Sequence, residues 1–268
     1  MKIKEKSQMC YRFLTSPKVV KLSWIGIVIT WIGGTIVALL IAQLDPIGPT
    51  TDLAGFNPLI NYISDLGNQD LTPMPIIMNW AMMTTALLMI SPALYLIILL
   101  QGDGSKLIRK ILAYLTSISM LIGMLGLFFT GVISEDVGEV WDLLFPIGYP
   151  WHDLTADIAF YLFMGSGILV ASQFIIFPDI LRDKLGLDKS KIRRVRIFYI
   201  INSWIITPVC FAFFYTVPYL WYTDEFWTFL PTWQWAPIWE WLLMISLTAW
   251  MLSASRLIVK HLKHEKSK

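Results

Sequence analysis

The stretch LSWIGIVITWIGGTIVALLIAQL, residues 22–44, contains no charged side chain. About 20 consecutive apolar residues are enough for a helix to cross the hydrocarbon core of a bilayer, so this stretch predicts a transmembrane helix. The apolar residues come in long blocks rather than at amphipathic spacing. Five more blocks follow, at 75–100, 111–133, 154–177, 197–220 and 236–258. The predicted fold class is therefore all-α, a polytopic integral membrane protein with a six-transmembrane-helix bundle.

The composition of the whole chain agrees with a membrane protein. Of its 268 residues, 56% are hydrophobic and 15% are charged, whereas a soluble domain carries about 25% charged residues. The basic leader at 1–21 and the long apolar run after it favour a retained anchor over a cleaved signal peptide. We expect a single membrane domain over 1–268.

The distribution of basic residues predicts the orientation. All 21 Lys and Arg residues fall on one side of the six-span topology, and the connecting segments on the other side, 45–74, 134–153 and 221–235, contain none. By the positive-inside rule, both termini are predicted to be cytoplasmic and these three segments external, in the cell membrane. The basic segments are expected to anchor to lipid headgroups. Membrane lipids are thus the expected partners, and nucleic acid is not.

Small residues predict close packing between the helices. Gly34, Ala38 and Ala42 recur at four-residue steps in the first span, and the third span contains Ser119 and Gly123. Such residues let helix backbones approach each other in lipid. Packing within one bundle is the favoured interpretation. The sequence leaves the oligomeric state open, a homo-oligomer included.

The first external segment contains the stretch GFNPLINYISDLGNQDLTPMP, residues 55–75. It is too long for a minimal turn and too apolar to extend freely into water, so we expect it to lie on the membrane surface or to re-enter the bundle. Irregular backbone at membrane depth must be buried in protein or line a wet cavity. Four polar residues of the stretch are candidates for such a lining: Asn61, Ser64, Asp65 and Asn68.

The second external segment, SEDVGEVWDLLFPIGYPWHDLTAD at 134–157, is rich in acids. An ionisable residue inside the bilayer boundary is a functional candidate by default, and Asp157 has that position. Asp153 lies one helical turn before it on the same face. We predict an external ligand-binding pocket whose ionisable residues are Asp65, Glu135, Asp136, His152, Asp153, Asp157 and Glu240. The alternative is a set of solvated loop acids.

Several chemistries are excluded by the histidines and by missing motifs. His152 is the only histidine outside the tail that contains His261 and His264, so neither bis-histidine haem ligation nor a three-histidine zinc site is available. The sequence contains no HExxH motif, Walker A loop or GxSxG elbow. We expect no cofactor and assign no metal ligand. Whether the external acids hold a cation stays open.

The stretches NPLINYISDLG (57–67) and YPWHDLTADIAFYLF (149–163) support a family resemblance. They resemble a prokaryotic membrane family called domain of unknown function 998, which is itself distantly similar to the Frag/DRAM/Sfk membrane proteins. The resemblance implies an integral membrane protein with an external site that includes Asp65 and His152. The eukaryotic relatives imply a link to lipid, by analogy only.

Three functions remain open at this level. The first is binding or sensing of a lipid or other amphipathic ligand, with the Trp-rich stretch at 221–241 holding the apolar part. The second is a small transporter or proton-coupled permease that uses Asp157 and Glu240. The third is a membrane-embedded lipid-modifying enzyme in which His152 acts as general base. A structural partner without a site is the alternative to all three.

Overall fold

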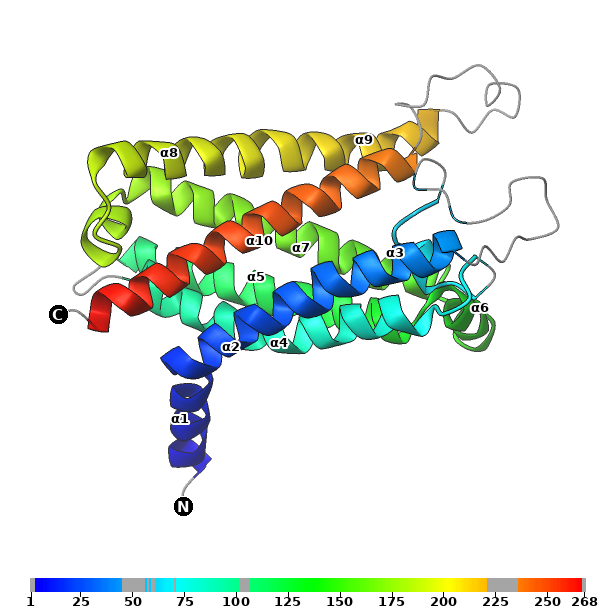
Figure 1. Cartoon of the computed structure of the whole chain (residues 1–268), viewed down its shortest axis with the longest axis horizontal. Helices are drawn as coiled ribbons and strands as arrows, with labels where there is room; N and C mark the ends of the chain where they lie inside the picture. The colour runs from blue at the N-terminus through cyan, green and yellow to red at the C-terminus, as the bar shows by residue number, and fades with distance from the viewer. Residues whose placement is uncertain are drawn as a thin grey trace.

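The computed structural model describes residues 3–44, 56, 58, 61–69, 71–101, 107–220 and 236–266. All the long elements of the described residues are helices (Figure 1). The α-helices are α1 (Ile3–Leu14), α2 (Pro17–Ile27), α3 (Gly34–Leu44), α4 (Ile76–Leu100), α5 (Leu107–Val132), α6 (Glu135–Leu144), α7 (Trp151–Ile176), α8 (Lys189–Tyr199), α9 (Thr207–Leu220) and α10 (Ala236–Lys266). Four shorter elements are η1 (Val28–Gly33), η2 (Ser64–Gly67), η3 (Ile180–Lys184) and η4 (Ile200–Ile206).

Six helices are long and apolar enough to cross a membrane, and each corresponds to one predicted span. Two of them combine several elements: α2, η1 and α3 form the first, and α8, η4 and α9 form the fifth. The observed helices extend beyond the predicted spans at several ends. The fourth begins at Trp151 instead of 154, and the sixth continues to Lys266 instead of 258. Hydropathy reports the apolar part of a helix, whereas backbone hydrogen bonding continues into the polar flanks.

The spans run alternately up and down along one long axis (Figure 1). Helix α5 packs against both α4 and α7, α9 packs against α10, and α2 and α3 cover α4. The short helix α6 lies at the end of the bundle where α3 ends and α4 begins. The two predicted polar segments therefore meet at one end, which we call the mouth.

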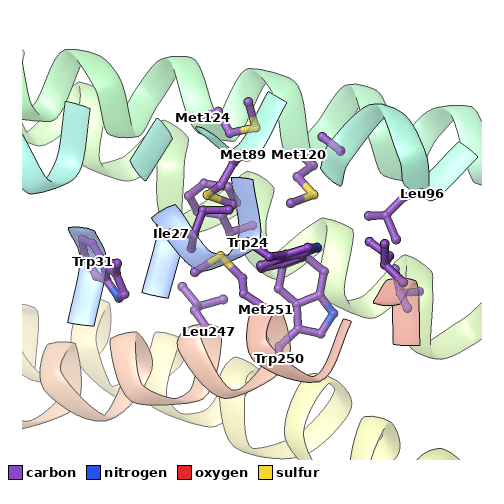
Figure 2. Packing of buried hydrophobic residues seen from close by; sticks show 14 of the residues in the cluster. Trp24, Ile27, Trp31, Met89, Leu96, Met120, Met124, Leu247, Trp250 and Met251 are labelled. Carbon is purple, nitrogen blue, oxygen red and sulfur yellow. The ribbon is translucent and has the colours of Figure 1, made fainter. Parts of the chain in front are cut away.

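The centre of the bundle is filled by large apolar side chains. Trp24 and Ile27 from α2 face Met89 from α4, and Trp250 and Met251 approach from α10 (Figure 2). All five are almost fully buried. Because lipid is as apolar as these residues, close packing rather than water exclusion has to hold the helices together. The outward-facing side chains of the spans, such as Ile29, Leu125 and Ile245, remain exposed, as expected for contact with lipid tails.

The predicted small residues lie at helix contacts within the bundle. Gly34 lies against Ala81 of α4. Ala38 and Ala42 are buried. Ser119 of α5 donates a hydrogen bond of 2.8 Å to the carbonyl of Leu162 in α7. These residues bring α3 close to α4 and α5 close to α7, in agreement with intramolecular packing.

Candidate functional site

A cavity of about 420 Å³ lies at the mouth, where α7, α9, α10 and the segment 61–69 meet. Its polar wall contains six of the residues predicted from the sequence: Ser64, Glu135, His152, Asp153, Asp157 and Glu240. Its aromatic wall was not predicted and consists of Tyr62, Tyr149, Phe160, Phe214 and Tyr215. The cavity is therefore lined by acidic and aromatic side chains together.

The segment 61–67 enters the bundle and is held there by the second turn of α10. The backbone N–H of Ile63 donates to Glu240 Oε2 at 2.7 Å. The indole N–H of Trp241 donates to the carbonyl of Asn61 at 3.0 Å. Ile63 and Leu66 are buried, so apolar side chains anchor the segment in the bundle. The two hydrogen bonds to α10 satisfy backbone polar groups that would otherwise be buried without a partner. Leu59, Ile60 and Asp70 lie outside the described residues.

Helix α6 holds the same segment from the opposite side. Glu135 accepts hydrogen bonds from Ser64 Oγ at 3.3 Å and from Asn68 Nδ2 at 2.8 Å. The next residue, Asp136, accepts from the backbone N–H of Gln69 at 3.1 Å. Asp136 thus contacts the loop but does not line the cavity. Successive residues of a helix point about 100° apart, which separates the two neighbouring acids.

Asp65 lies behind the wall of the cavity and is buried. Its Oδ2 accepts hydrogen bonds from the backbone N–H of Tyr62 at 2.9 Å and from Asn61 Nδ2 at 3.2 Å. Burial, followed by the negative charge of Glu135, raises the pKa of Asp65 to about 8. The raised pKa favours the protonated form of Asp65, which is hydrogen-bonded to Glu135. Among the described residues, Asp65 makes no hydrogen bond with His152 or Asp157.

Tyr62 belongs to the segment 61–67 and lines the cavity. Burial raises the pKa of Tyr62 to about 12, and the nearby charges of Glu240 and Asp65 act in the same direction. Its hydroxyl therefore remains protonated at any physiological pH and can act as a hydrogen-bond donor.

His152 is 6% exposed and is fixed by one hydrogen bond of 2.6 Å between Nδ1 and the carbonyl oxygen of Ile133. That carbonyl follows the last turn of α5, where backbone acceptors lack helical partners. Because a carbonyl can only accept, Nδ1 must carry the proton. In the neutral ring Nε2 is then an acceptor, and it has no hydrogen-bond partner among the described residues.

Asp157 accepts hydrogen bonds from two tyrosine hydroxyls. Tyr149 OH donates to Oδ2 at 2.7 Å, and Tyr215 OH of α9 donates to Oδ1. Tyr149 lies in one of the two motif stretches, but Tyr215 lies in an apolar span where no sequence signal marks it. No group of three or more His, Cys, Asp or Glu side chains arranged for a metal ion occurs in the described part of the chain.

These observations define a multi-pass helical membrane protein with an acidic and aromatic cavity at one end of its bundle. The chain belongs to the family described as "Protein of unknown function (DUF998)", whose sequence profile matches residues 24–257. Comparisons with curated proteins and with solved structures gave no match.

Proposed function

We propose that this protein binds or senses a membrane lipid or another amphipathic ligand, with the polar headgroup in the cavity at the mouth. The observation that carries the proposal is the composition of the cavity, where acids and hydroxyls share one enclosure with Phe160 and Phe214. Ligand sites typically combine apolar walls with a few convergent polar groups. Such a surface matches a molecule that is polar at one end and apolar at the other.

A second hollow offers a place for the apolar part of that ligand. It is an apolar groove of about 340 Å³ between the first span and α10, and its lining includes Trp31, Ile36, Met244 and Ile245. A small hollow between the two shares Trp31 and Ile63 with the groove, and Phe160 and Glu240 with the cavity. The small hollow thus adjoins both of the larger ones. Trp241 lines the groove, whereas residues 221–235 of the Trp-rich stretch lie outside the described residues.

The proposal predicts that neutralising the cavity acids reduces lipid retention. In the double variant Glu135→Gln with Asp157→Asn, both side chains keep an acceptor oxygen but lose their charge. Because a hydrogen bond to a charged group contributes about 1.5–3 kcal/mol, we expect co-purified lipid to fall by about tenfold or more. Lipid extraction followed by mass spectrometry measures this directly.

The matched control is Glu139→Gln, which neutralises an exposed acid one turn further along α6. It should purify with the same lipid content as the unmodified chain. A double variant that keeps its unfolding temperature and its full lipid content would contradict the proposed function.

We also propose that both termini are cytoplasmic and that the cavity opens on the outer face of the cell membrane. The support is the charge distribution, since all 21 Lys and Arg residues lie in segments other than 45–74, 134–153 and 221–235. Cys10 is exposed on α1 and Cys210 is buried, so Cys10 is a native reporter. A membrane-impermeant thiol reagent should label Cys10 in inside-out vesicles and leave it unlabelled in intact cells. Labelling in intact cells would reverse the orientation.

A membrane-embedded lipid-modifying enzyme is the second candidate, because His152 lines the cavity together with carboxylates and its buried Nε2 has no partner among the described residues. Turnover of a labelled lipid that is lost in His152→Gln would favour the enzyme over binding alone.

Transport through Asp157 and Glu240 is less well supported, since both residues lie at the mouth rather than near the middle of the bundle. The relation to Frag/DRAM/Sfk proteins stays a prediction based on Asp65, His152 and their neighbouring residues.

A further inference from the structure

We propose that the cavity selects ligands by a primary ammonium group, so that an amine-bearing lipid headgroup is preferred to an anionic, quaternary or sugar headgroup. This inference rests on the proposed function and names the chemical class of its ligand. Three independent properties of the cavity lead to it: its charge, the hydrogen-bonding state of His152, and its aromatic wall.

The charge of the cavity favours a cation. Four carboxyl groups line it, and none of its lining residues is Lys or Arg. The ion pairs in the described part of the chain use other acids, namely Asp179, Asp183, Asp188 and Glu265. The segments 45–74 and 221–235 contain no Lys or Arg that could supply a positive charge. Carboxylates without a counter-charge are costly in a low-dielectric setting, so a positive ligand group would offset that cost. A headgroup with a net negative charge would increase it.

The state of His152 favours a ligand that donates hydrogen bonds. The bond to the carbonyl of Ile133 places the ring proton on Nδ1 and leaves Nε2 as the acceptor of the neutral ring. The residue is 6% exposed, lines the cavity, and has no partner for Nε2 among the described residues. A buried acceptor without a donor costs free energy. A quaternary ammonium has no N–H group and cannot donate a hydrogen bond to Nε2, whereas a primary ammonium has three N–H donors.

The aromatic wall is suited to a cation as well. Phe214 packs edge to face against Tyr62, with ring centroids 6.2 Å apart, and against Phe160, at 5.9 Å. All three rings line the same cavity as the acids. Ring faces attract ammonium groups, and they do so more strongly where water is excluded. Aromatic rings also stack on sugars, but a neutral sugar would leave the four carboxyl groups without a counter-charge.

The test compares headgroups in which the N–H groups of the ammonium are replaced one at a time by N-methyl groups. Delipidated protein in detergent is incubated with phosphatidylethanolamine, its mono- and dimethylated forms, and phosphatidylcholine, all with identical acyl chains. Bound lipid is measured by native mass spectrometry. We expect retention to fall as N–H groups are removed, with phosphatidylcholine bound about tenfold more weakly than phosphatidylethanolamine. Phosphatidylglycerol and a glycosyl diacylglycerol complete the series and should bind as weakly as phosphatidylcholine.

Soluble competitors distinguish a lipid from a free amine as the source of the ammonium group. Ethanolamine should displace phosphatidylethanolamine, whereas choline at the same concentration should not. If ethanolamine alone binds as tightly as the lipid, the ligand is a small amine and the acyl chains contribute nothing. That result would support the preference for an ammonium group and would contradict the claim that this group belongs to a lipid.

Two variants localise the preference to the cavity. His152→Phe removes the Nε2 acceptor and should abolish the difference between phosphatidylethanolamine and phosphatidylcholine, whereas Glu139→Gln on the exposed face of α6 should preserve it. The methylation series on the unmodified chain is informative even if His152→Phe does not fold. Equal binding across that series, or a preference for phosphatidylglycerol or the glycolipid, would overturn the ammonium inference. Failure of every lipid to bind would instead overturn the proposed function.

Discussion

Gly126→Ala is expected to lower the stability of the bundle, although it adds only one methyl group. A Cβ at this position would lie 2.6 Å from the backbone nitrogen of Ala159 and 2.8 Å from the carbonyl oxygen of Thr155. Both atoms belong to the backbone of α7, so they cannot move aside as a flexible side chain could. Helices α5 and α7 would have to separate along their shared contact.

The expected loss for Gly126→Ala is about 1–3 kcal/mol, the usual cost of overpacking a well-packed interior. For a chain of this size, that corresponds to a drop of about 2–12 °C in the midpoint of thermal unfolding. The same change should weaken lipid retention, because His152 and Asp153 lie in the first turn of α7, immediately before the contact.

Gly33→Ala provides the matched control for this measurement. Gly33 also lies in a membrane-spanning helix, but a Cβ there would meet no atom within 4 Å. Alanine is favoured over glycine in helices by about 1 kcal/mol, so Gly33→Ala should leave stability unchanged or raise it. Equal midpoints for the two variants would show that α5 and α7 are not held at the distance described.

The sequence was sufficient to predict the number of spans and the convergence of the polar segments. Apolar length predicts a crossing helix, and the alternation of spans places the segments at 45–74 and 134–153 at the same end. What hydropathy could not predict was where each helix ends. Trp151 begins α7 three residues before the predicted span, so His152 and Asp153 have helical positions and face the cavity.

The sequence predicted which segments meet at the mouth better than it predicted which of their side chains line the cavity. Glu135 and Asp136 are adjacent in sequence, yet only Glu135 lines the cavity. Asp65 lies behind the cavity wall and contacts Glu135, because α6, which the sequence did not predict, folds over the loop. Tyr215 was missed because nothing in an apolar span distinguishes a residue that faces a cavity from one that faces lipid.

The packing contacts show the same limit. Gly123 was recognised from its spacing with Ser119, and it does lie against Phe163 of α7. The tighter contact is at Gly126, whose partner at four-residue spacing, Thr130, was not singled out in the sequence. Its importance follows from the path of α7, a feature that the sequence of α5 alone cannot contain.

Arg109→Gln is expected to destabilise the end of the bundle opposite the mouth. Arg109 is 6% exposed, and its Nε donates at 2.7 Å to the carbonyl oxygen of Leu100, the last residue of α4. Its Nη1 donates to Asp179 Oδ2 at 2.5 Å, and the guanidinium lies 5.7 Å from the ring centre of Phe177. One side chain thus joins the end of α4, the start of α5 and the turn after α7.

Removing this guanidinium leaves a helix-terminal carbonyl and a carboxylate without their donor. Breaking a fully buried ion pair costs about 3–5 kcal/mol, but the Asp179 side chain is 40% exposed and can be partly solvated. We therefore expect a loss of about 2–3 kcal/mol for Arg109→Gln. Arg109→Lys should fall in between, because a single ammonium replaces a fork that reaches two acceptors on different elements.

Lys110→Gln is the control, since Lys110 is the next residue of α5 and is exposed. It removes one positive charge from the same helix end without touching Leu100 or Asp179, so its unfolding midpoint should stay close to that of the unmodified chain. In the folded state, Arg109→Gln should retain the same headgroup preference, because the cavity lies at the other end of the spans. Equal midpoints for Arg109→Gln and Lys110→Gln would show that the Arg109 contacts do not stabilise this end.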